Sequence, residues 1–258
     1  MNLDIENRLF VVTGATSGFG KSITERLIGE GATVIINARG SEKLVDFQKQ
    51  HPEQIEIIPG DITTDATISQ LIRKIGNRQL AGMVLNAGGP PAASFINTII
   101  QDWDDAYASI LRWKVKLTKE ILPLLSPNNY GRLVYIESCS VKQPVENLVL
   151  SNSLRLAVVG FVKTLSQEVA SSGITLNIIA PGYHDTPAME RLFNKKSDVL
   201  GITKEAARAA FEKETLTGKM GNPDDLASLA LWLLSPHSGY MTGQTISVDG
   251  GLIKGVFS

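Results

Sequence analysis

The sequence Thr13-Gly14-Ala15-Thr16-Ser17-Gly18-Phe19-Gly20 joins two segments of different character. The apolar run at residues 9–12 is typical of a buried strand, and residues 21–29 carry apolar side chains at helical spacing. Glycine lets a turn adopt backbone angles that other residues avoid, and it lets backbone N–H groups approach a ligand closely. Because the N-terminus of the following helix adds a partial positive charge, we expect this strand–turn–helix unit to hold a phosphate group. An ordinary glycine-rich turn is the alternative interpretation.

Short apolar runs rich in β-branched residues alternate with amphipathic stretches along the whole chain. The runs predicted to be strands are residues 9–13, 33–37, 55–58, 83–86, 132–137, 174–180 and 245–248. The stretches predicted to be helices are residues 21–29, 42–50, 65–75, 103–125, 154–171 and 224–234. Strands this continuously apolar are typically covered on both faces, and their alternation with helices is typical of a parallel sheet with crossover helices. The sequence therefore predicts a single-domain α/β fold over residues 1–258, a doubly wound Rossmann-type parallel sheet of about seven strands with helices on both faces.

One polar and charged insertion, residues 184–220, interrupts this alternation and includes the stretch Asn194-Lys195-Lys196-Ser197-Asp198. The insertion follows the carboxyl end of a predicted strand, which is the edge where open α/β sheets bind ligands. We therefore expect it to act as a lid over a substrate site.

The composition excludes several classes of function. The chain has 25 Lys and Arg against 26 Asp and Glu, so no bulk field attracts nucleic acid or an anionic membrane. No apolar stretch approaches the roughly 18 residues that span a bilayer, and the acidic start lacks the pattern of a secretory signal. With one cysteine and three histidines without ligand spacing, neither an internal disulfide nor a metal site is indicated. We expect a cytoplasmic protein that acts on a small molecule.

The spacing Thr-Gly-x-x-x-Gly-x-Gly, together with Asn86-Ala87-Gly88 after a later predicted strand, resembles the short-chain dehydrogenase/reductase family. Further matches that spread the resemblance over nearly the whole chain are Gly60-Asp61-Ile62, Asn177-Ile178-Ile179-Ala180-Pro181-Gly182, Thr242-Gly243-Gln244 and Asp249-Gly250-Gly251. The resemblance implies a dinucleotide cofactor, with Asp61 near the adenine and with Pro181, Gly182 and Thr186 near the nicotinamide. Pro181-Gly182 can also be interpreted as a turn that ends the strand, and both interpretations can be true together. The positions expected to contact the cofactor are Gly14, Thr16, Ser17, Gly18, Phe19, Gly20, Arg39, Asp61, Ile62, Asn86, Ala87, Gly88, Arg155, Pro181, Gly182 and Thr186.

The end of the second predicted strand, Asn37-Ala38-Arg39, indicates which dinucleotide is bound. A carboxylate at this place would accept hydrogen bonds from the 2′-hydroxyl of the ribose and would repel a 2′-phosphate. No acid is present, and the Arg39 guanidinium can pair with a 2′-phosphate. NADP is therefore favoured over NAD. Arg39 could instead be a solvated loop residue that stacks on the adenine.

The expected catalytic positions depart from the family pattern. Members use a Tyr-x-x-x-Lys pair on a helix, a serine about a dozen residues before the tyrosine, and often an asparagine on the preceding long helix. Alignment places Ser151 at the tyrosine, Arg155 at the lysine and Ile110 at the asparagine, and only Ser138 matches. Ser138 precedes Ser151 by 13 residues, which supports this alignment.

These replacements change what the site can do. A tyrosine phenol with a pKa of ~10 can donate a proton when a neighbouring ammonium lowers that pKa, whereas a serine hydroxyl ionises far less readily. Arg155 can hold the nicotinamide ribose but stays protonated, so it cannot relay a proton.

Other residues at this edge are candidate proton donors, namely Tyr183, His184, Lys142 and Glu146. The alternative is that Tyr183 forms a pocket wall and that the other three are solvated loop residues. Cys139 is expected to be a small buried apolar side chain, because no base is identifiable beside it.

Two functions remain open. The first is a divergent NADP-linked oxidoreductase that acts on a carbonyl or alcohol of the 3-oxoacyl, ketone or sugar type, with Ser138, Ser151, Arg155 and Tyr183 as its candidate catalytic residues. The second is a catalytically inactive NADP-binding sensor or assembly protein. Family members commonly pair through the two long helices after the fourth and fifth strands. We therefore expect a homodimer or homotetramer, with apolar side chains at Val158, Val159, Phe161 and Val162 available for that contact.

Overall fold

The computed structural model describes residues 2–125 and 130–256 and contains one parallel sheet. Its strands are β1 (Leu9–Thr13), β2 (Thr33–Ala38), β3 (Ile55–Pro59), β4 (Leu80–Leu85), β5 (Gly131–Ile136), β6 (Ile174–Pro181) and β7 (Thr245–Val248). They lie in the order β3-β2-β1-β4-β5-β6-β7, with every neighbouring pair parallel. The chain runs outward in one direction from β1 and in the other from β4, so the switch of direction falls between these two strands. Ligands bind at such a switch point in doubly wound sheets.

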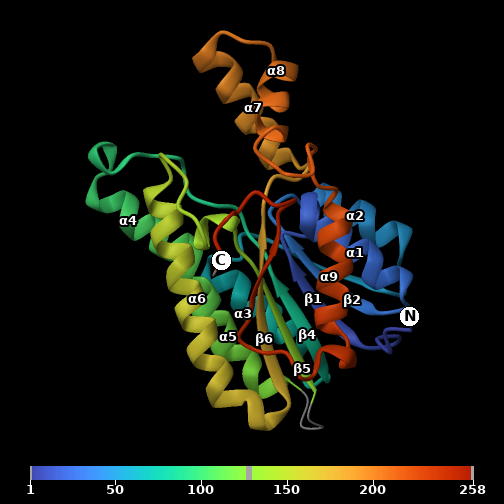
Figure 1. Ribbon diagram of the computed structural model, residues 1–258. Helices are drawn as coiled ribbons and strands as arrows, with labels where there is room; N and C mark the ends of the chain where they lie inside the picture. The colour runs from blue at the N-terminus through green and yellow to red at the C-terminus, as the bar shows by residue number, and fades with distance from the viewer. Residues whose placement is uncertain (1, 126–129, 257–258) are drawn as a thin grey trace.

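Helices cover both faces of the sheet (Figure 1). The helices α1 (Gly18–Gly29), α2 (Ser41–Gln50) and α9 (Pro223–Leu234) pack on one face. The helices α3 (Asp65–Ile75), α5 (Trp113–Ile121) and α6 (Val149–Val169) pack on the other. Along β1, Phe10 and Val12 enter the first core while Leu9 and Val11 enter the second, because successive side chains of a strand point to opposite faces. The predicted fold class is confirmed.

The helix predicted at residues 103–125 is interrupted. It forms α4 (Ile100–Tyr107), a π-helical turn at Ala108–Arg112, and α5. Ile110 lies in the π-helical turn and is buried in the second core. Its apolar side chain packs there against the sheet, at the position where alignment expects a polar residue.

The predicted insertion at residues 184–220 contains two helices, α7 (Pro187–Leu200) and α8 (Lys204–Glu212). They project beyond the carboxyl edge of the sheet, where β6 leads into α7 (Figure 1). A small core of their own is built from Met189, Phe193, Ala207 and Met220. This separate core explains how the segment holds its shape while standing away from the sheet.

None of the helices in the described parts of the chain has the length and apolarity to cross a bilayer. Within the same residues no group of three or more His, Cys, Asp or Glu side chains is placed to hold a metal ion.

Candidate active site

The glycine turn has the backbone shape that its sequence demands. Gly14 and Gly18 have φ of +61° and +51°, a region that side chains with a Cβ rarely adopt. At Gly20 a Cβ atom would lie 2.2 Å from the carbonyl oxygen of Gly14, so only glycine allows α1 to start this close to the turn. Ser17 caps α1 in an extended conformation without a side-chain cap bond, which leaves its hydroxyl and the first N–H groups of α1 available to a phosphate.

The ends of β1 and β4 are tied together at the switch point. The Thr13 hydroxyl donates to the carbonyl of Asn86, and the N–H of Asn86 donates back to the same hydroxyl oxygen, each at 2.8 Å. The Asn86 side chain lies against Gly14, where a Cβ would be 2.9 Å from Nδ2. The segment from Asn86 to Gly88 therefore borders the glycine turn, as predicted for a shared cofactor site.

The end of β2 and the turn after β3 form the expected adenine side of the site. The Asn37 amide donates to the carbonyls of Ile58 and Gly60 at 2.9 and 3.1 Å. Asp61 Oδ1 accepts hydrogen bonds from the backbone and hydroxyl of Thr63. Ile62 beside it is buried. Arg39 is exposed and makes no ion pair with any residue that the structure describes, so its guanidinium is available to an anionic ligand.

Of the residues expected at the nicotinamide end, Thr186 lies beside the glycine turn. The Gly182 N–H donates to the Val248 carbonyl at 2.9 Å, which joins the end of β6 to β7. Thr186 caps α7, and its methyl group would be 3.3 Å from a Cβ on Gly18. The structure thus brings the turn, the end of β4 and the start of α7 to one edge of the sheet.

Behind this edge lies a chain of buried charged groups. The Glu137 carboxylate, at the end of β5, pairs with Lys114 of α5 through Oε1 and with Arg155 of α6 through Oε2, the latter at 2.9 Å. Arg155 Nε donates to the Ser151 hydroxyl at 3.1 Å, one helical turn away. Burial lowers the pKa of the Lys114 ammonium; the Arg155 charge acts in the same direction and the Glu137 carboxylate opposes both.

Ser138 directly follows Glu137 and is half-buried. Its hydroxyl oxygen accepts the N–H of Ser140 at 3.1 Å and thereby caps a short helical turn at Cys139–Val141. The oxygen is the acceptor in this bond, so the bond does not use the hydroxyl proton, and the same side chain is in hydrogen-bond contact with the Cys139 thiol. Cys139 is buried as expected, and burial raises the pKa of its thiol.

Tyr183 directly precedes the insertion at residues 184–220 and packs against its small core. Its hydroxyl donates to Glu214 at 2.8 Å, and its ring meets Phe211 edge-on at 5.0 Å. Burial and the Glu214 carboxylate raise its pKa, so the phenol is a weaker acid than usual. This arrangement agrees with the alternative of a pocket wall, and the catalytic role of Tyr183 stays a prediction.

The other three candidate proton donors have different environments. His184 is buried against Phe19 and not solvated, which contradicts the expectation of an exposed loop residue. The backbone of His184 pairs with Gly221 in an isolated strand bridge. Because Gly221 has no Cβ, there is room for the His184 ring beside it. Burial lowers its pKa. Lys142 is half-buried, and Glu146 is exposed, as expected for residues in a loop.

Sequence reasoning missed Lys114 and Glu137 as members of the site. A signal for Lys114 was present, since it lies four residues after Ile110 and three before Leu117 and therefore shares their buried face. For Glu137 the signal was an acid at the end of an otherwise apolar strand. None of the five tyrosines is followed by a lysine four residues later, so the chain has no Tyr-x-x-x-Lys pair at another position.

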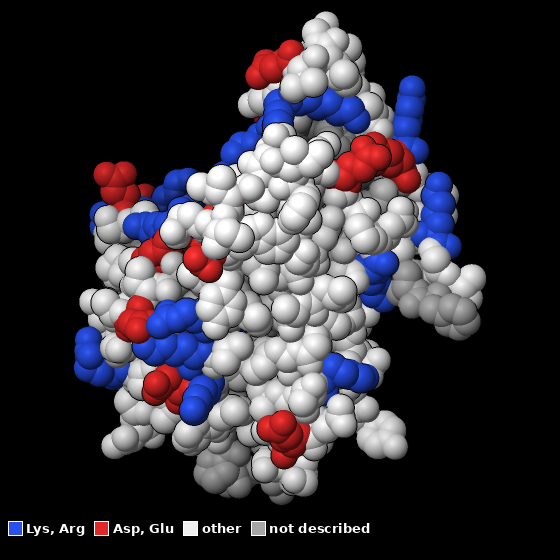
Figure 2. Space-filling model, turned by 90° about the vertical axis from the view of Figure 1, so that its left-hand side faces the viewer, with Lys and Arg blue, Asp and Glu red and all other residues white. Residues whose placement is uncertain are grey.

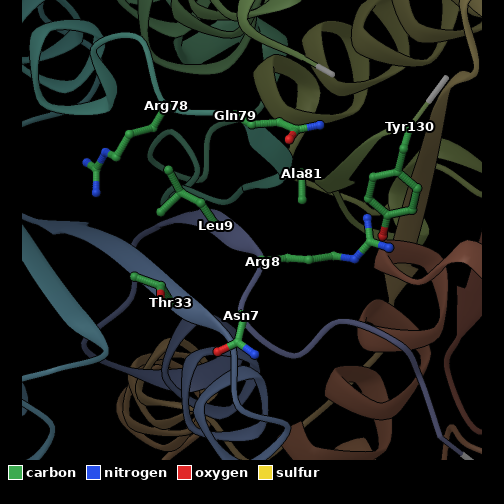
Figure 3. Close-up of a pocket in the computed structure, with 8 residues that line it drawn as sticks. All are labelled: Asn7, Arg8, Leu9, Thr33, Arg78, Gln79, Ala81 and Tyr130. Atoms are coloured by element: carbon green, nitrogen blue, oxygen red, sulfur yellow. The ribbon is translucent and has the colours of Figure 1, made fainter. Parts of the chain in front are cut away.

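A cavity of about 480 Å³ lies at the opposite, amino-terminal edge of the sheet (Figure 3). It is lined by Asn7, Arg8, Leu9, Thr33, Arg78, Gln79, Ala81 and Tyr130. Arg8 extends toward the Tyr130 ring and stacks on it at 4.2 Å, while Arg78 is paired with Glu56. The cavity is separate from the residues that the sequence assigns to the cofactor.

Comparison with known proteins identifies the family. The model of the enoyl-(acyl carrier protein) reductase family matches residues 14–253. A putative ketoacyl reductase of Streptomyces coelicolor is 30% identical over 254 residues, covering 96% of this chain and 97% of the relative. The 3-oxoacyl-[acyl-carrier-protein] reductase of Thermotoga maritima is 28% identical, covering 96% and 99%.

Solved structures agree with this assignment. A variant of actinorhodin polyketide ketoreductase with NADPH has 30% identity and a TM-score of 0.89, covering 95% of this chain and 97% of that one. An NADPH-dependent reductase of bacilysin biosynthesis has 25% identity and a TM-score of 0.91, covering 97% and 100%. The predicted oxidoreductase class and the predicted NADP cofactor agree with these relatives. The chain belongs to the short-chain dehydrogenase/reductase family.

Proposed function

We propose that the protein is an NADPH-dependent reductase of a ketone, 3-oxoacyl or sugar carbonyl. The observation that carries the proposal is that a complete glycine turn, tied to β4 through Thr13 and Asn86, shares one sheet edge with Ser138, Ser151 and Arg155. Relatives named as ketoacyl and 3-oxoacyl reductases support the same class of substrate.

The residues present fit an NADP-type dinucleotide. The open N-terminus of α1 fits the pyrophosphate. Arg39 fits a 2′-phosphate, because it is exposed and has no ion-pair partner among the described residues. Arg155 and the segment after Asn86 would hold the nicotinamide ribose. The bound cofactor supplies the hydride.

The chain's own residues act on the substrate oxygen. Ser138 donates its hydroxyl proton, which the bond from the Ser140 N–H does not use, to that oxygen in a hydrogen bond and so polarises the carbonyl. The Ser151 oxygen accepts from Arg155, so its own proton is likewise directed to a second acceptor. A water molecule at the sheet edge delivers the proton that completes the alcohol, because neither serine is a strong enough acid to do so.

A second candidate function is that of an NADPH-binding protein without turnover, and the absence of a Tyr-x-x-x-Lys pair favours it.

Measurement of cofactor binding and hydride transfer distinguishes the reductase from the binding protein. Purified protein would be titrated with NADPH and NADH, and the loss of NADPH absorbance would be followed with ketones, 3-oxoacyl thioesters, enones and sugars. Turnover of a carbonyl supports the reductase. Tight binding with no turnover, and no gain from Ser151→Tyr with Arg155→Lys, supports the binding protein. Failure to bind either nucleotide overturns both.

The surroundings of the reaction are also part of the proposal. We place the protein in the cytoplasm, where its buried Cys139 stays reduced, and we assign it a homo-oligomer. Val158 and Val162 do not form the expected contact surface, because they are buried against the sheet. Exposed apolar side chains gather instead around the start of α4, at Phe95, Ile96, Ile99 and Ile100.

A further inference from the structure

Three charged side chains from three different elements meet beneath the proposed substrate site. The side chain of Glu137 is 0% exposed, that of Lys114 is 3% exposed and that of Arg155 is 10% exposed. Both carboxylate oxygens are used, one by each cation. Such a buried arrangement differs from the surface ion pairs of this protein, such as Lys116 with Asp65 at 2.9 Å.

The cluster carries one more positive than negative charge. Glu137, directly after β5, and Arg155 of α6 are the charged groups that face Lys114. The Trp113 ring of α5 lies 5.5 Å from the Lys114 ammonium. The nearby Tyr135 hydroxyl of β5 is hydrogen-bonded to Thr118 and adds no charge. Asp65 of α3 pairs outward with Lys116 and Arg112. Among the described residues no second carboxylate balances the cluster, although burying an uncompensated cation is costly.

The excess charge faces the proposed site through Arg155. Its Nε is bonded to Ser151 and its Nη1 to Glu137, while its Nη2 would lie 2.9 Å from a Cβ on Gly89, in the segment after β4. The absence of a side chain at Gly89 therefore leaves room for the end of the guanidinium. Arg155 is the most exposed member of the cluster, so the positive charge is oriented toward the sheet edge.

We infer that Lys114 and Glu137 are positioning residues of this active site: Glu137 fixes Arg155, and Lys114 cancels the Glu137 charge so that Arg155 remains an effective cation toward the substrate. The inference rests on the reductase function proposed above. In that reaction a hydride adds to the carbonyl carbon, the π pair of the C=O bond moves to the oxygen, and that oxygen takes a proton from water. The water is left as hydroxide, which the solvent neutralises. A fixed excess positive charge stabilises the negative charge while it develops on the oxygen.

The net charge of the cluster supplies the test, because one substitution removes the excess charge and a second substitution restores it. The wild-type cluster is +1, Lys114→Met is 0, and Lys114→Met with Glu137→Gln returns to +1 through Arg155 alone. We expect Lys114→Met to lower kcat for a reducible ketone on the order of tenfold or more, with Kd for NADPH little changed. The double variant should recover a substantial part of kcat, and Lys114→Arg should retain it. Lys116→Met, which removes a surface lysine of the same helix, is the matched control and should leave kcat unchanged.

The pH dependence gives a second, independent readout. Because the pKa of Lys114 is lowered, we expect the wild-type kcat to fall at alkaline pH as Lys114 loses its proton. The double variant should lack this fall, and Lys114→Arg should move it to higher pH. In the apoprotein we expect the stability to change with pH in the opposite direction to kcat. The unfolded chain binds the proton more readily than the folded one, so wild-type stability relative to Lys114→Met should rise as pH increases toward the ordinary lysine value of 10.5.

The outcomes separate this inference from the proposed function. An unchanged kcat in Lys114→Met, or a double variant that is no better than Lys114→Met and shows the same alkaline fall, overturns the charge role. If Lys114→Met does not fold, the comparison of wild type with Lys114→Arg decides, and identical alkaline falls overturn the inference. If no substrate is reduced at all, the proposed function fails. The stability titration of the apoprotein still shows whether Lys114 is the ionised cation that the inference requires. A rise relative to Lys114→Met that is confined to alkaline pH supports the inference, and a rise that is already under way below neutral pH shows a neutral Lys114 and overturns it.

Discussion

Gly20 is the residue at which the glycine turn tolerates least change. A Cβ there would lie 2.2 Å from the carbonyl oxygen of Gly14, and backbone cannot move aside cheaply. We expect Gly20→Ala to destabilise the fold by about 1–3 kcal/mol or more and to weaken NADPH binding, because the start of α1 must shift. Gly29→Ala is the matched control in the same helix, since a Cβ there meets nothing within 4 Å. Thermal unfolding and nucleotide titration of both variants would test this, and equal behaviour would contradict it.

Arg39 is the residue that we expect to choose the cofactor. Removal of one charge-assisted contact to a 2′-phosphate is worth about 1.5–3 kcal/mol, so Arg39→Ala should weaken NADPH binding roughly ten- to hundredfold. NADH, which has no 2′-phosphate, should bind as before. Arg73→Ala, on the exposed side of α3, serves as the control for a general loss of positive charge. If Arg39→Ala weakens the binding of NADPH and of NADH to the same extent, Arg39 stacks on the adenine and does not bind the 2′-phosphate.

Local and distant residues of the site differ in how well the sequence predicts them. Gly14, Gly18 and Gly20 are recognisable because the turn needs them at fixed short spacing beside a strand and a helix. Lys114 and Glu137 are separated by 23 residues and meet only when α5 packs on the end of β5. Their partnership depends on tertiary packing, and neither residue type is diagnostic alone. The sequence shows an unexpected charged residue in α5 and another at the end of β5. It does not show that the two residues are in contact.

At the scale of elements, the continuously apolar strands were predictable because both faces of the sheet are covered. The break between α4 and α5 was not, since the apolar spacing continues through the π-helical turn at Ala108–Arg112. The extra residue in that turn results from the pattern of backbone hydrogen bonds, and the spacing of apolar residues in the sequence does not reveal that pattern. The helices of the segment at residues 184–220 were also missed, because their apolar faces serve a separate small core in a strongly charged segment.

The contacts of Tyr183, directly before the insertion at residues 184–220, lead to a prediction. Its hydroxyl is engaged by Glu214 and its ring by Phe211, so we expect Tyr183→Phe to keep kcat within a few-fold of wild type. The lost hydrogen bond is partly exposed and should cost about 1 kcal/mol or less in stability. Tyr240→Phe, at a fully exposed position, is the control. Steady-state kinetics would decide, and a loss of kcat by orders of magnitude would identify Tyr183 as the proton donor that the sequence offered.

For the whole molecule, the carboxyl edge of the sheet and the flank over α4 and α6 have different uses. The edge gathers the glycine turn, the buried charges and the insertion at residues 184–220 at the carboxyl ends of the strands, beside the switch point between β1 and β4. Figure 2 shows the flank, where uncharged surface runs down the middle and charged side chains gather toward its margins. An uncharged flank of this kind is typical of a surface that contacts another protein.

The exposed apolar residues of this flank lead to the prediction about assembly. Ile100, at the start of α4, is 77% exposed, and apolar neighbours at Phe95, Ile96 and Ile99 are exposed with it. A second copy of the chain placed there would remove this surface from water, and each fully buried side chain of this size would contribute about 1.5–3 kcal/mol. We therefore expect Ile100→Asp to shift the protein toward monomers in sedimentation or light-scattering measurements. Val199→Asp, which changes a similarly exposed residue (73%) on α7, should leave the assembly intact. A monomeric wild type, or equal responses of the two variants, would show that the flank is not the contact surface.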